Sequence, residues 1–313
     1  MKILIIGIGS IAKKHITAIR ELNIKCDLFA LRSSSSSKIV DGVINLYSLE
    51  ELNNFKFDFA IISNPTHLHS KYINLLTELG VNLFIEKPAV NEIGLLDELS
   101  VKINHHGIKT YVACNLRFHP CIIYLKNYLM QHCKMIINEV NVYCGSYLPD
   151  WRPDLDFRKN YSVSHVLGGG VHLDLFHEID YTYWLFGMPL LSKNFKSSKS
   201  TLKIDAYDYA NYLLTYKNFN VSIILNYYRK DPKRTIEIVF NDDTWIIDLL
   251  KNTIVNYKSE TIFKDDAFDI QNTYKDQMSY FIEKISTDQI PMNTFSESIN
   301  PLKIALNHES VKR

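Results

Sequence analysis

A lysine that follows an apolar stretch is the first residue here that could do chemistry. Residues Val81–Ile85 predict a buried parallel strand, and Glu86, Lys87 and Pro88 come directly after it. The proline ends the strand and fixes the direction of its exit. A lysine at the carboxyl end of such a strand lies where open α/β sheets bind ligands. Because a buried cation needs a partner, we expect Lys87 to lie beside Glu86 or a ligand. The alternative is a solvated lysine at a strand end.

An aspartate and a histidine are the second candidates. Asp174 and His177 are three residues apart in a predicted helix over 171–187, so they share one helical face. A carboxylate one turn before a histidine can hold the imidazole in one tautomer and raise its basicity. The glycines 168–170 before the helix leave room for a ligand or the opposite domain. A local ion pair on a surface helix is the alternative. We reject a metal site that includes His172, because no further ligands have a recognisable spacing.

A glycine pattern at the start of the chain indicates a nucleotide site. A predicted strand, Lys2–Ile6, and a predicted helix, 10–22, flank the sequence Gly7-Ile8-Gly9-Ser10-Ile11-Ala12. In such a G-x-G-x-x-A turn the first glycine permits the turn, the second admits a diphosphate, and the small alanine lets helix and strand pack closely. The helix start offers N–H groups to the phosphates. This setting favours dinucleotide binding over a purely structural turn.

The end of the second predicted strand, 25–31, bears on the choice of coenzyme. Arg32 and Ser33 follow it, and no carboxylate is there to bind a ribose 2′-hydroxyl. Arginine and serine suit a 2′-phosphate, so the sequence favours NADP slightly over NAD. For the serines 34–37 a solvated loop is the alternative.

A further strand end carries polar groups. The predicted strand 57–63 ends in Asn64 and Pro65, and His67 and His69 follow at a helix start. This end lies on the same rim of the predicted sheet as Lys87, so either histidine could contact coenzyme or substrate. A capping or surface histidine is the alternative.

Aromatic residues and arginine gather in the predicted loop 147–161, which contains Tyr147, Trp151 and Arg152. This chemistry on a loop suits a sugar or a carboxylate ligand. A packed Ω-loop is the alternative.

The elements that must position these residues fall into two halves. Strands alternate with helices as far as Cys114, which predicts a doubly wound parallel sheet. Antiparallel strands follow between 191 and 256, and helices are expected over 270–285 and 298–309. The sequence therefore predicts an α/β domain over 1–116 and an α+β domain over 117–313.

Composition excludes several classes of protein. The 313 residues suffice for about two domains, and the net charge of +1 gives no sign of a nucleic-acid or membrane partner. The five scattered cysteines suit reduced thiols in the cytoplasm. The apolar start could pass for a signal peptide, but it breaks at Gly7, so it predicts a first strand. No apolar run approaches the ~18 residues of a membrane helix.

In their order and spacing, these motifs resemble the Gfo/Idh/MocA oxidoreductases, the family of glucose–fructose oxidoreductase and inositol dehydrogenase. The resemblance covers nearly the whole chain. It implies a Rossmann domain that binds NAD or NADP and a second domain with a large, mostly antiparallel sheet, through which relatives often form dimers or tetramers. Its landmarks are the glycine turn, Asn64-Pro65 with His69, Glu86-Lys87-Pro88, Asn115-Leu116-Arg117-Phe118, and Gly168-Gly169-Gly170 with Asp174 and His177.

The resemblance also assigns roles to residues. Lys87 matches the family's catalytic lysine, whose bond to the next proline is cis in relatives, and His177 matches the acid/base histidine. Asp174 matches the accompanying aspartate, although many members place it four residues before the histidine rather than three. Coenzyme contacts are implied for Gly7, Gly9, Ser10, Ile11, Ala12, Arg32, Ser33, Asn64, Pro65, His69, Glu86, Lys87 and Asn115. Substrate contacts are implied for Lys87, Arg117, Tyr147, Trp151, Arg152, Asp174 and His177.

The implied activity is an NAD(P)-dependent dehydrogenase acting on a sugar or nucleotide-sugar. The segments 147–153 and 177–181 are similar to a subgroup associated with bacterial surface-sugar biosynthesis. One alternative is an enzyme that recycles bound NAD during epimerisation or glycoside cleavage. The other is a sensor that binds dinucleotide or sugar without turnover.

Overall fold

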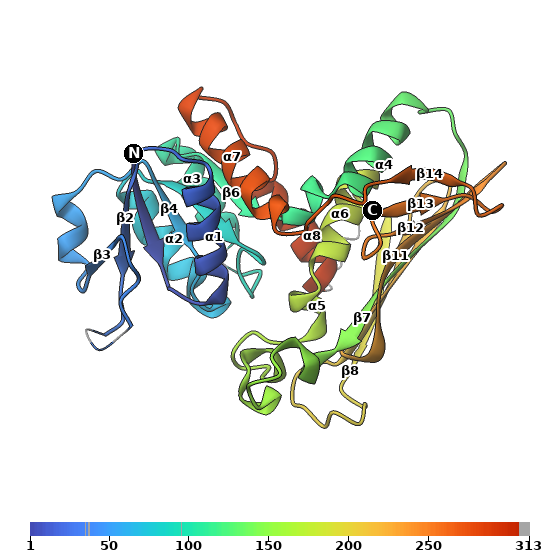
Figure 1. Ribbon diagram of the computed structural model, residues 1–313, viewed down its shortest axis with the longest axis horizontal. Helices are drawn as coiled ribbons and strands as arrows, with labels where there is room; N and C mark the ends of the chain where they lie inside the picture. The colour runs from blue at the N-terminus through green and yellow to red at the C-terminus, as the bar shows by residue number, and fades with distance from the viewer. Residues whose placement is uncertain (35, 37, 95, 307–313) are drawn as a thin grey trace. The chain divides into compact units, whose positions relative to one another are not determined.

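The computed structural model of the protein describes residues 1–34, 36, 38–94 and 96–306 (Figure 1). The chain divides into two compact units. The first contains Met1–Asn115 together with Ile270–Ile299. The second contains Leu116–Asp269 and, among the described residues, 300–306.

A six-stranded sheet forms the centre of the first unit, and all its neighbouring strands are parallel. Its strand order, β3-β2-β1-β4-β5-β6, reverses direction between β1 and β4. Ligands bind at such a reversal in doubly wound sheets. The predicted Rossmann fold is therefore confirmed. The strands are β1 (Lys2–Ile6), β2 (Asp27–Leu31), β3 (Val43–Leu46), β4 (Phe59–Ile62), β5 (Asn82–Glu86) and β6 (Thr110–Ala113).

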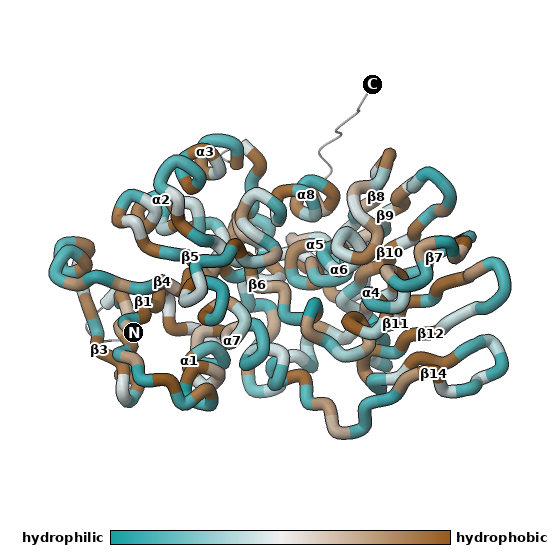
Figure 2. Tube along the Cα trace, turned by 90° about the horizontal axis from the view of Figure 1, so that it is seen from above, coloured by the Kyte–Doolittle hydropathy of each residue, from teal (hydrophilic) through white to brown (hydrophobic). Residues whose placement is uncertain are grey.

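Apolar strand residues form the core of this unit, and the hydrophobic colour of the strands can be followed in Figure 2. Strand β4 is buried along its whole length, as a strand covered on both faces must be. A 3₁₀ turn, η1 (Glu50–Asn54), lies before β4. The α-helices of the unit are α1 (Ser10–Glu21), α2 (His69–Glu78), α3 (Leu96–His106) and α7 (Asn272–Ser286), and η2 (Thr66–Leu68) precedes α2.

A late segment of the chain completes the first unit, although the sequence assigned it to the second domain. Helix α7 packs on α1. It inserts Phe281, whose ring centroid lies 5.3 Å from that of Phe59 and 5.6 Å from that of Phe84. The side-chain amide of Asn293 donates to the carbonyl of Val112 on β6. These contacts explain why 270–299 belongs with the first sheet.

An eight-stranded sheet forms the second unit, in the order β14-β13-β12-β11-β7-β10-β9-β8. Pairing is antiparallel except between β7 and β10, so the expected mostly antiparallel sheet is confirmed. The register of β11 against β7 is irregular between Tyr228 and Lys233. The strands are β7 (Ile137–Tyr147), β8 (Leu191–Ser197), β9 (Tyr209–Thr215), β10 (Asn220–Asn226), β11 (Tyr228–Phe240), β12 (Thr244–Asp248), β13 (Thr253–Val255) and β14 (Thr261–Lys264).

Helices cover one face of this sheet, over buried residues such as Val140, Val142 and Cys144 of β7. The strand register places Leu213, Ser222, Asn141, Glu237 and Ile246 in one row on the opposite face. The helical segments are α4 (Pro120–Gln131), α5 (Val171–Asp174) and α6 (His177–Phe186), with short 3₁₀ turns η4 (Leu148–Trp151), η5 (Phe157–Lys159) and η6 (Tyr161–Val163). Two further elements, η3 (Asn115–Phe118) and α8 (Phe295–Leu306), begin in the first unit and end in the second.

Two helices differ from the bounds expected for them or extend outside the described residues. The single helix expected over 171–187 is two helices, α5 and α6, separated at Leu175 and Phe176. The last helix was expected to reach Glu309, but residues after Leu306 lie outside the described residues. Within the described chain, every helix is too short or too polar to cross a membrane.

Candidate functional site

The glycine turn of the first unit has the geometry that its sequence predicts. Gly7 has a φ of +84°, and a Cβ there would lie 2.7 Å from the Cα of Asn64, so only glycine fits. A Cβ at Gly9 would meet nothing within 4 Å, which leaves that side of the turn open to a ligand. Helix α1 then begins at Ser10 with no side-chain cap from the described chain. Its first N–H groups, near Ser10 and Ile11, suit a phosphate.

Close packing and a hydrogen bond stabilise this turn. Ala12 is fully buried, which explains why a small residue is needed there. The hydroxyl of Ser63 donates to the carbonyl of Gly7 at 3.0 Å and so ties the end of β4 to the turn. Pro65 is exposed beside it.

Asn64 is the clearest sign that a polar ligand belongs at this edge. Both polar atoms of its side-chain amide are buried and have no hydrogen-bond partner among the described residues. Buried amides without partners are rare, and a bound ligand or water usually satisfies them. The open side at Gly9 and the amide of Asn64 together fit a dinucleotide, which these residues and the start of α1 would hold.

His69, expected to contact the coenzyme, is 99% buried instead. Its Nδ1 lies 3.2 Å from the carbonyl oxygen of Ala89 and its Nε2 lies 2.9 Å from that of Asn64. Burial lowers its pKa, and the two carbonyls and the charge of Glu86 act against that effect. His69 therefore braces two backbone segments of the first unit. The exposed His67 makes no such contact in the described chain.

Two other expected coenzyme residues also hold the protein together. Asn115 is buried, and its side-chain amide donates to the hydroxyl of Thr273 at 2.7 Å. Arg32 donates to the carbonyl of Lys38 at 2.9 Å and to the side chain of Asn45 at 3.3 Å. Arg32 thus holds the loop after β2, in which Ser33 is exposed.

Strand β5 delivers Glu86 and Lys87 to the carboxyl edge of the sheet, as predicted. The Lys87–Pro88 peptide bond is cis, as the resemblance implied. The carboxylate of Glu86 is nearly buried, and its partner is unexpected: Nε2 of His15 lies 2.6 Å from its Oε1. Its other oxygen accepts the backbone N–H of Lys87 at 3.2 Å. Nothing in the local pattern of α1 marks His15 as this partner.

In the second unit, the glycines before α5 permit a very close backbone approach. A Cβ at Gly169 would lie 2.2 Å from the carbonyl oxygen of Tyr161, and Gly170 has a φ of +126°. The amide of Val171 donates to the carbonyl of Tyr207 at 2.8 Å. The glycine run is therefore required so that α5 can begin against the loop that carries Tyr161.

Asp174, at the end of α5, accepts hydrogen bonds from two tyrosine hydroxyls. Tyr161 donates to Oδ1 at 2.9 Å, and Tyr227 donates to Oδ2 at 2.5 Å. Burial and the nearby Asp174 raise the pKa of both phenols well above their usual range, so both stay protonated donors. Nothing in the sequence around Tyr227 marks it as a partner of Asp174.

The expectation that Asp174 and His177 share a helical face is wrong. Leu175 adopts φ −93° and ψ +38°, which ends α5 after Asp174. His177 begins a new helix, α6, where it is half-buried. The two residues are neighbours in sequence across a helix break, and regular helical spacing does not set their relative direction.

Two expected substrate residues near the end of β7 have different surroundings. Trp151 packs on Tyr227, a partner of Asp174, whereas Tyr147 does not. Trp151 donates from Nε1 to the hydroxyl of Ser146 at 2.8 Å, and its ring meets that of Tyr227 edge-on at 5.4 Å. Alternation along β7 directs Tyr147 to the opposite side from Ser146. There, Nζ of Lys230 lies 3.1 Å from the ring centroid of Tyr147. The exposed Arg152 lies close enough for its charge to lower the pKa of Tyr161, against the larger effects of burial and Asp174.

Arg117, also expected to bind substrate, is 99% buried. Its Nε and Nη2 donate to the two carboxylate oxygens of Asp180 at 2.9 and 2.8 Å. Its guanidinium also lies 5.6 Å from the ring of Trp184. A second buried carboxylate of α6, Glu178, pairs with Arg234 in a similar way. These contacts account for the burial of Arg117, and the substrate site proposed below does not include it.

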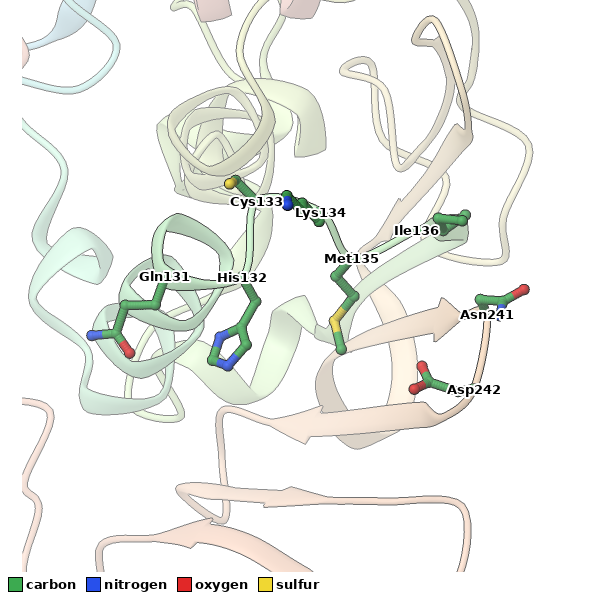
Figure 3. A pocket seen from close by; sticks show the side chains of 8 residues that line it. All are labelled: Gln131, His132, Cys133, Lys134, Met135, Ile136, Asn241 and Asp242. Atoms are coloured by element: carbon green, nitrogen blue, oxygen red, sulfur yellow. The ribbon is translucent and has the colours of Figure 1, made fainter.

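A pocket of about 550 Å³ lies elsewhere in the second unit and contains none of the expected site residues. Figure 3 shows Met135 between His132 and the turn that carries Asn241 and Asp242. In the part of the chain that the structure describes, no group of three or more His, Cys, Asp or Glu side chains could hold a metal ion.

Comparison with known proteins agrees with this geometry. The model of the Gfo/Idh/MocA oxidoreductase family with its NAD-binding Rossmann fold matches residues 1–113, so the resemblance is confirmed over that part of the chain. The 2,7-anhydro-N-acetylneuraminate hydratase of Mediterraneibacter gnavus is 26% identical over 145 residues, which are 45% of this chain and 35% of that protein. The match thus covers about a third of the curated relative.

Solved structures resemble the whole chain in fold. UDP-N-acetylglucosamine 3-dehydrogenase GnnA of Acidithiobacillus ferrooxidans has a TM-score of 0.78 and 18% identity, over 99% of this chain and 97% of that one. The WlbA dehydrogenase of Bordetella pertussis, solved with NADH and UDP-GlcNAcA, has a TM-score of 0.78 and 17% identity, over 98% of this chain and 93% of that one.

Proposed function

We propose that this chain is a Gfo/Idh/MocA oxidoreductase and that it transfers a hydride between a nicotinamide coenzyme and a hydroxyl or keto carbon of a sugar or nucleotide-sugar. The observation that carries the proposal is the set of groups at the carboxyl edge of the first unit's sheet. There the open turn at Gly9, the unsatisfied amide of Asn64 and the strand-end Lys87 follow neighbouring strands of one parallel sheet. The resemblance to dehydrogenases of nucleotide-sugars supports the substrate class.

Each residue has a distinct task in this reaction. When bound, the coenzyme supplies the redox chemistry. Lys87, as a cation, hydrogen-bonds the reacting oxygen and stabilises the negative charge that develops on it. His177 takes the hydroxyl proton in oxidation and returns it in reduction. Asp174, held by Tyr161 and Tyr227, orients a substrate hydroxyl by accepting a hydrogen bond from it. Trp151, held by Ser146, offers an apolar surface to a sugar ring.

The test is stoichiometric reduction of coenzyme. Purified protein is mixed with NAD⁺ or NADP⁺ and with UDP-N-acetylglucosamine, myo-inositol or a uronic-acid nucleotide-sugar, and the absorbance of reduced nicotinamide is followed. We expect net reduction with at least one sugar and none without sugar. A preference for NADP is part of the proposal, because Arg32 and Ser33 follow β2 where a carboxylate would bind the 2′-hydroxyl of NAD. Ser33→Asp should shift the preference toward NAD.

A second candidate is an enzyme that reduces and reoxidises its bound coenzyme within one turnover. The similarity to a hydratase over 145 residues favours considering it. Such an enzyme would convert an epimer, a glycoside or an anhydro-sugar with no net change in coenzyme. Product formation by mass spectrometry without accumulation of NADH would select this candidate. Coenzyme binding without conversion of any sugar would instead indicate a sensor.

The oligomeric state, the cellular location and the biological role of the protein are also proposals. The uncovered face of the second sheet carries exposed apolar side chains, among them Phe195, Leu213 and Ile246 at 60%, 57% and 41% exposure. Such a patch supports a homo-oligomer, a dimer or tetramer, built through this sheet. Leu213→Glu should then reduce the mass measured by light scattering. We also propose a cytoplasmic location and a role in bacterial surface-sugar biosynthesis, on the cysteine pattern and on the segments 147–153 and 177–181.

A further inference from the structure

Two buried histidines hold the segment that carries Lys87, one at each end. At the start, Nε2 of His15 contacts the carboxylate of Glu86 at 2.6 Å. At the other end, Nδ1 of His69 lies 3.2 Å from the carbonyl oxygen of Ala89. The histidines come from α1 and α2, and each is at least 99% buried. The backbone around Lys87 is therefore fixed by side chains from two different helices.

Glu86 divides its carboxylate between a side chain and the backbone. Oε1 meets His15, and Oε2 accepts the N–H of Lys87 at 3.2 Å. Only 9% of Glu86 is exposed, so water contributes little to its solvation. A carboxylate this poorly hydrated depends on protein donors. If the imidazole were removed, Glu86 would turn toward another donor and its hold on the Lys87 amide would change.

His15 is itself held rigidly. Its ring packs edge-on against Phe84 at 4.9 Å and against Tyr274 at 6.0 Å between ring centroids. Its Nδ1 is buried with no hydrogen-bond partner in the described chain, so the ring makes its polar contact through Nε2 alone. A histidine in this position is specialised for one acceptor, and that acceptor is Glu86.

Helix α1 is the element that begins at the Gly9 turn, and His15 lies on its second turn. The contact with Glu86 thus links the helix that would hold the coenzyme phosphates to the residue before Lys87. We propose that His15 is a positioning residue: through Glu86 it sets the place of Lys87 relative to the coenzyme. This inference rests on the proposed function, in which Lys87 stabilises the oxygen of the reacting carbon.

Two amide variants at position 15 separate the effect of side-chain length from the effect of side-chain polarity. In His15→Gln the amide nitrogen extends about as far as Nε2 and can still donate to Glu86. In His15→Asn the amide stops near the position of Nδ1, which has no partner in the described chain. With NAD⁺ or NADP⁺ and the sugar that supports turnover, we expect His15→Asn to lower kcat by about 10- to 100-fold. We expect His15→Gln to stay within a few-fold of wild type, and both variants to bind coenzyme as wild type does. Equal kcat in all three proteins would overturn the proposal, even if their melting temperatures differ.

A second measurement does not depend on turnover. The rate at which acetic anhydride modifies Lys87 is followed against pH by peptide mass spectrometry, with the exposed Lys134 as the internal control. We expect His15→Asn and Glu86→Gln to change the profile of Lys87, while His15→Gln and the Lys134 profile stay as in wild type. An identical Lys87 profile in every variant would overturn the role of His15. Lack of turnover by wild type with every sugar would count against the proposed function instead, and the modification profile would still decide about His15.

Discussion

Tyr227 donates a 2.5 Å hydrogen bond to Asp174 and so joins the end of β10 to the end of α5. The two residues are 53 positions apart in sequence. Tyr161 binds the other carboxylate oxygen, and Trp151 packs edge-on against Tyr227. Side chains from three segments therefore set the direction of the Asp174 carboxylate.

This relationship predicts a specific effect of removing one hydroxyl. In Tyr227→Phe, Oδ2 of Asp174 loses its hydrogen bond from the phenol. This loss costs about 1–3 kcal/mol of unfolding free energy. We also expect KM for sugar to rise, because Asp174 can then turn away. Urea denaturation and steady-state kinetics measure the two effects. Tyr181→Phe is the matched control, since the hydroxyl of Tyr181 is buried without a partner among the described residues. That change should cost no stability, and an equal loss in both variants would contradict this account.

The chemical step should depend on Lys87 and His177. Lys87→Met removes the cation and His177→Gln removes the titratable proton carrier, and each change keeps a side chain of similar size. Loss of a general acid/base costs about 10²- to 10⁴-fold in kcat. We expect losses in that range for both variants, with coenzyme affinity unchanged by fluorescence titration. Near wild-type turnover in either variant would refute the corresponding role.

Arg117 should matter for stability rather than for substrate binding. Its guanidinium is buried against Asp180, and removing one member of such a pair leaves a charge without a partner. We expect Arg117→Met to lose about 3–5 kcal/mol of unfolding free energy in chemical denaturation. The double variant Arg117→Met with Asp180→Leu should recover much of this loss. A stable Arg117→Met protein with a raised KM would show instead that Arg117 binds substrate.

His119 should make the protein sensitive to acid. Its Nδ1 accepts the N–H of Cys121 and its Nε2 lies 3.1 Å from the carbonyl oxygen of Leu249, so the neutral ring caps α4. Burial lowers its pKa from 6.5 to about 4. The unfolded chain then binds the proton more readily, and stability falls as pH drops from 6.5 to about 4, by about 3 kcal/mol in total.

Thermal unfolding between pH 4 and 7 measures this effect. Asparagine can also cap a helix but does not titrate, so His119→Asn should flatten this part of the stability profile. His105→Asn, at an exposed position, is the control and should leave the profile unchanged. A profile of the same slope in His119→Asn and wild type would show that other groups cause the acid sensitivity.

The sequence predicted those features that depend on local signals. The turn at Gly7 is a consequence of one positive φ and of the contact with Asn64, both of which require glycine. The position of Lys87 follows from strand periodicity and the proline after it. The doubly wound parallel sheet followed from the alternation of strands and helices along the first part of the chain.

Contacts between distant segments could not be predicted in this way. His15 and Glu86 are 71 positions apart, and no periodicity relates them. The resemblance implied a substrate contact for Arg117, and the sequence does not reveal that Asp180 faces it. The break between Asp174 and His177 was missed because apolar residues continue through Leu175 and Phe176 at helical spacing. Only the backbone of Leu175, set by tertiary packing, separates the two helices.

The return of α7 to the first sheet has a consequence for synthesis of the chain. On the ribosome, the six strands emerge before Phe281, yet that ring fills the space beside Phe59 and Phe84. The first unit therefore keeps an uncovered apolar surface until more than 150 further residues have been translated. A nascent chain arrested between these points should be a preferred target for chaperones.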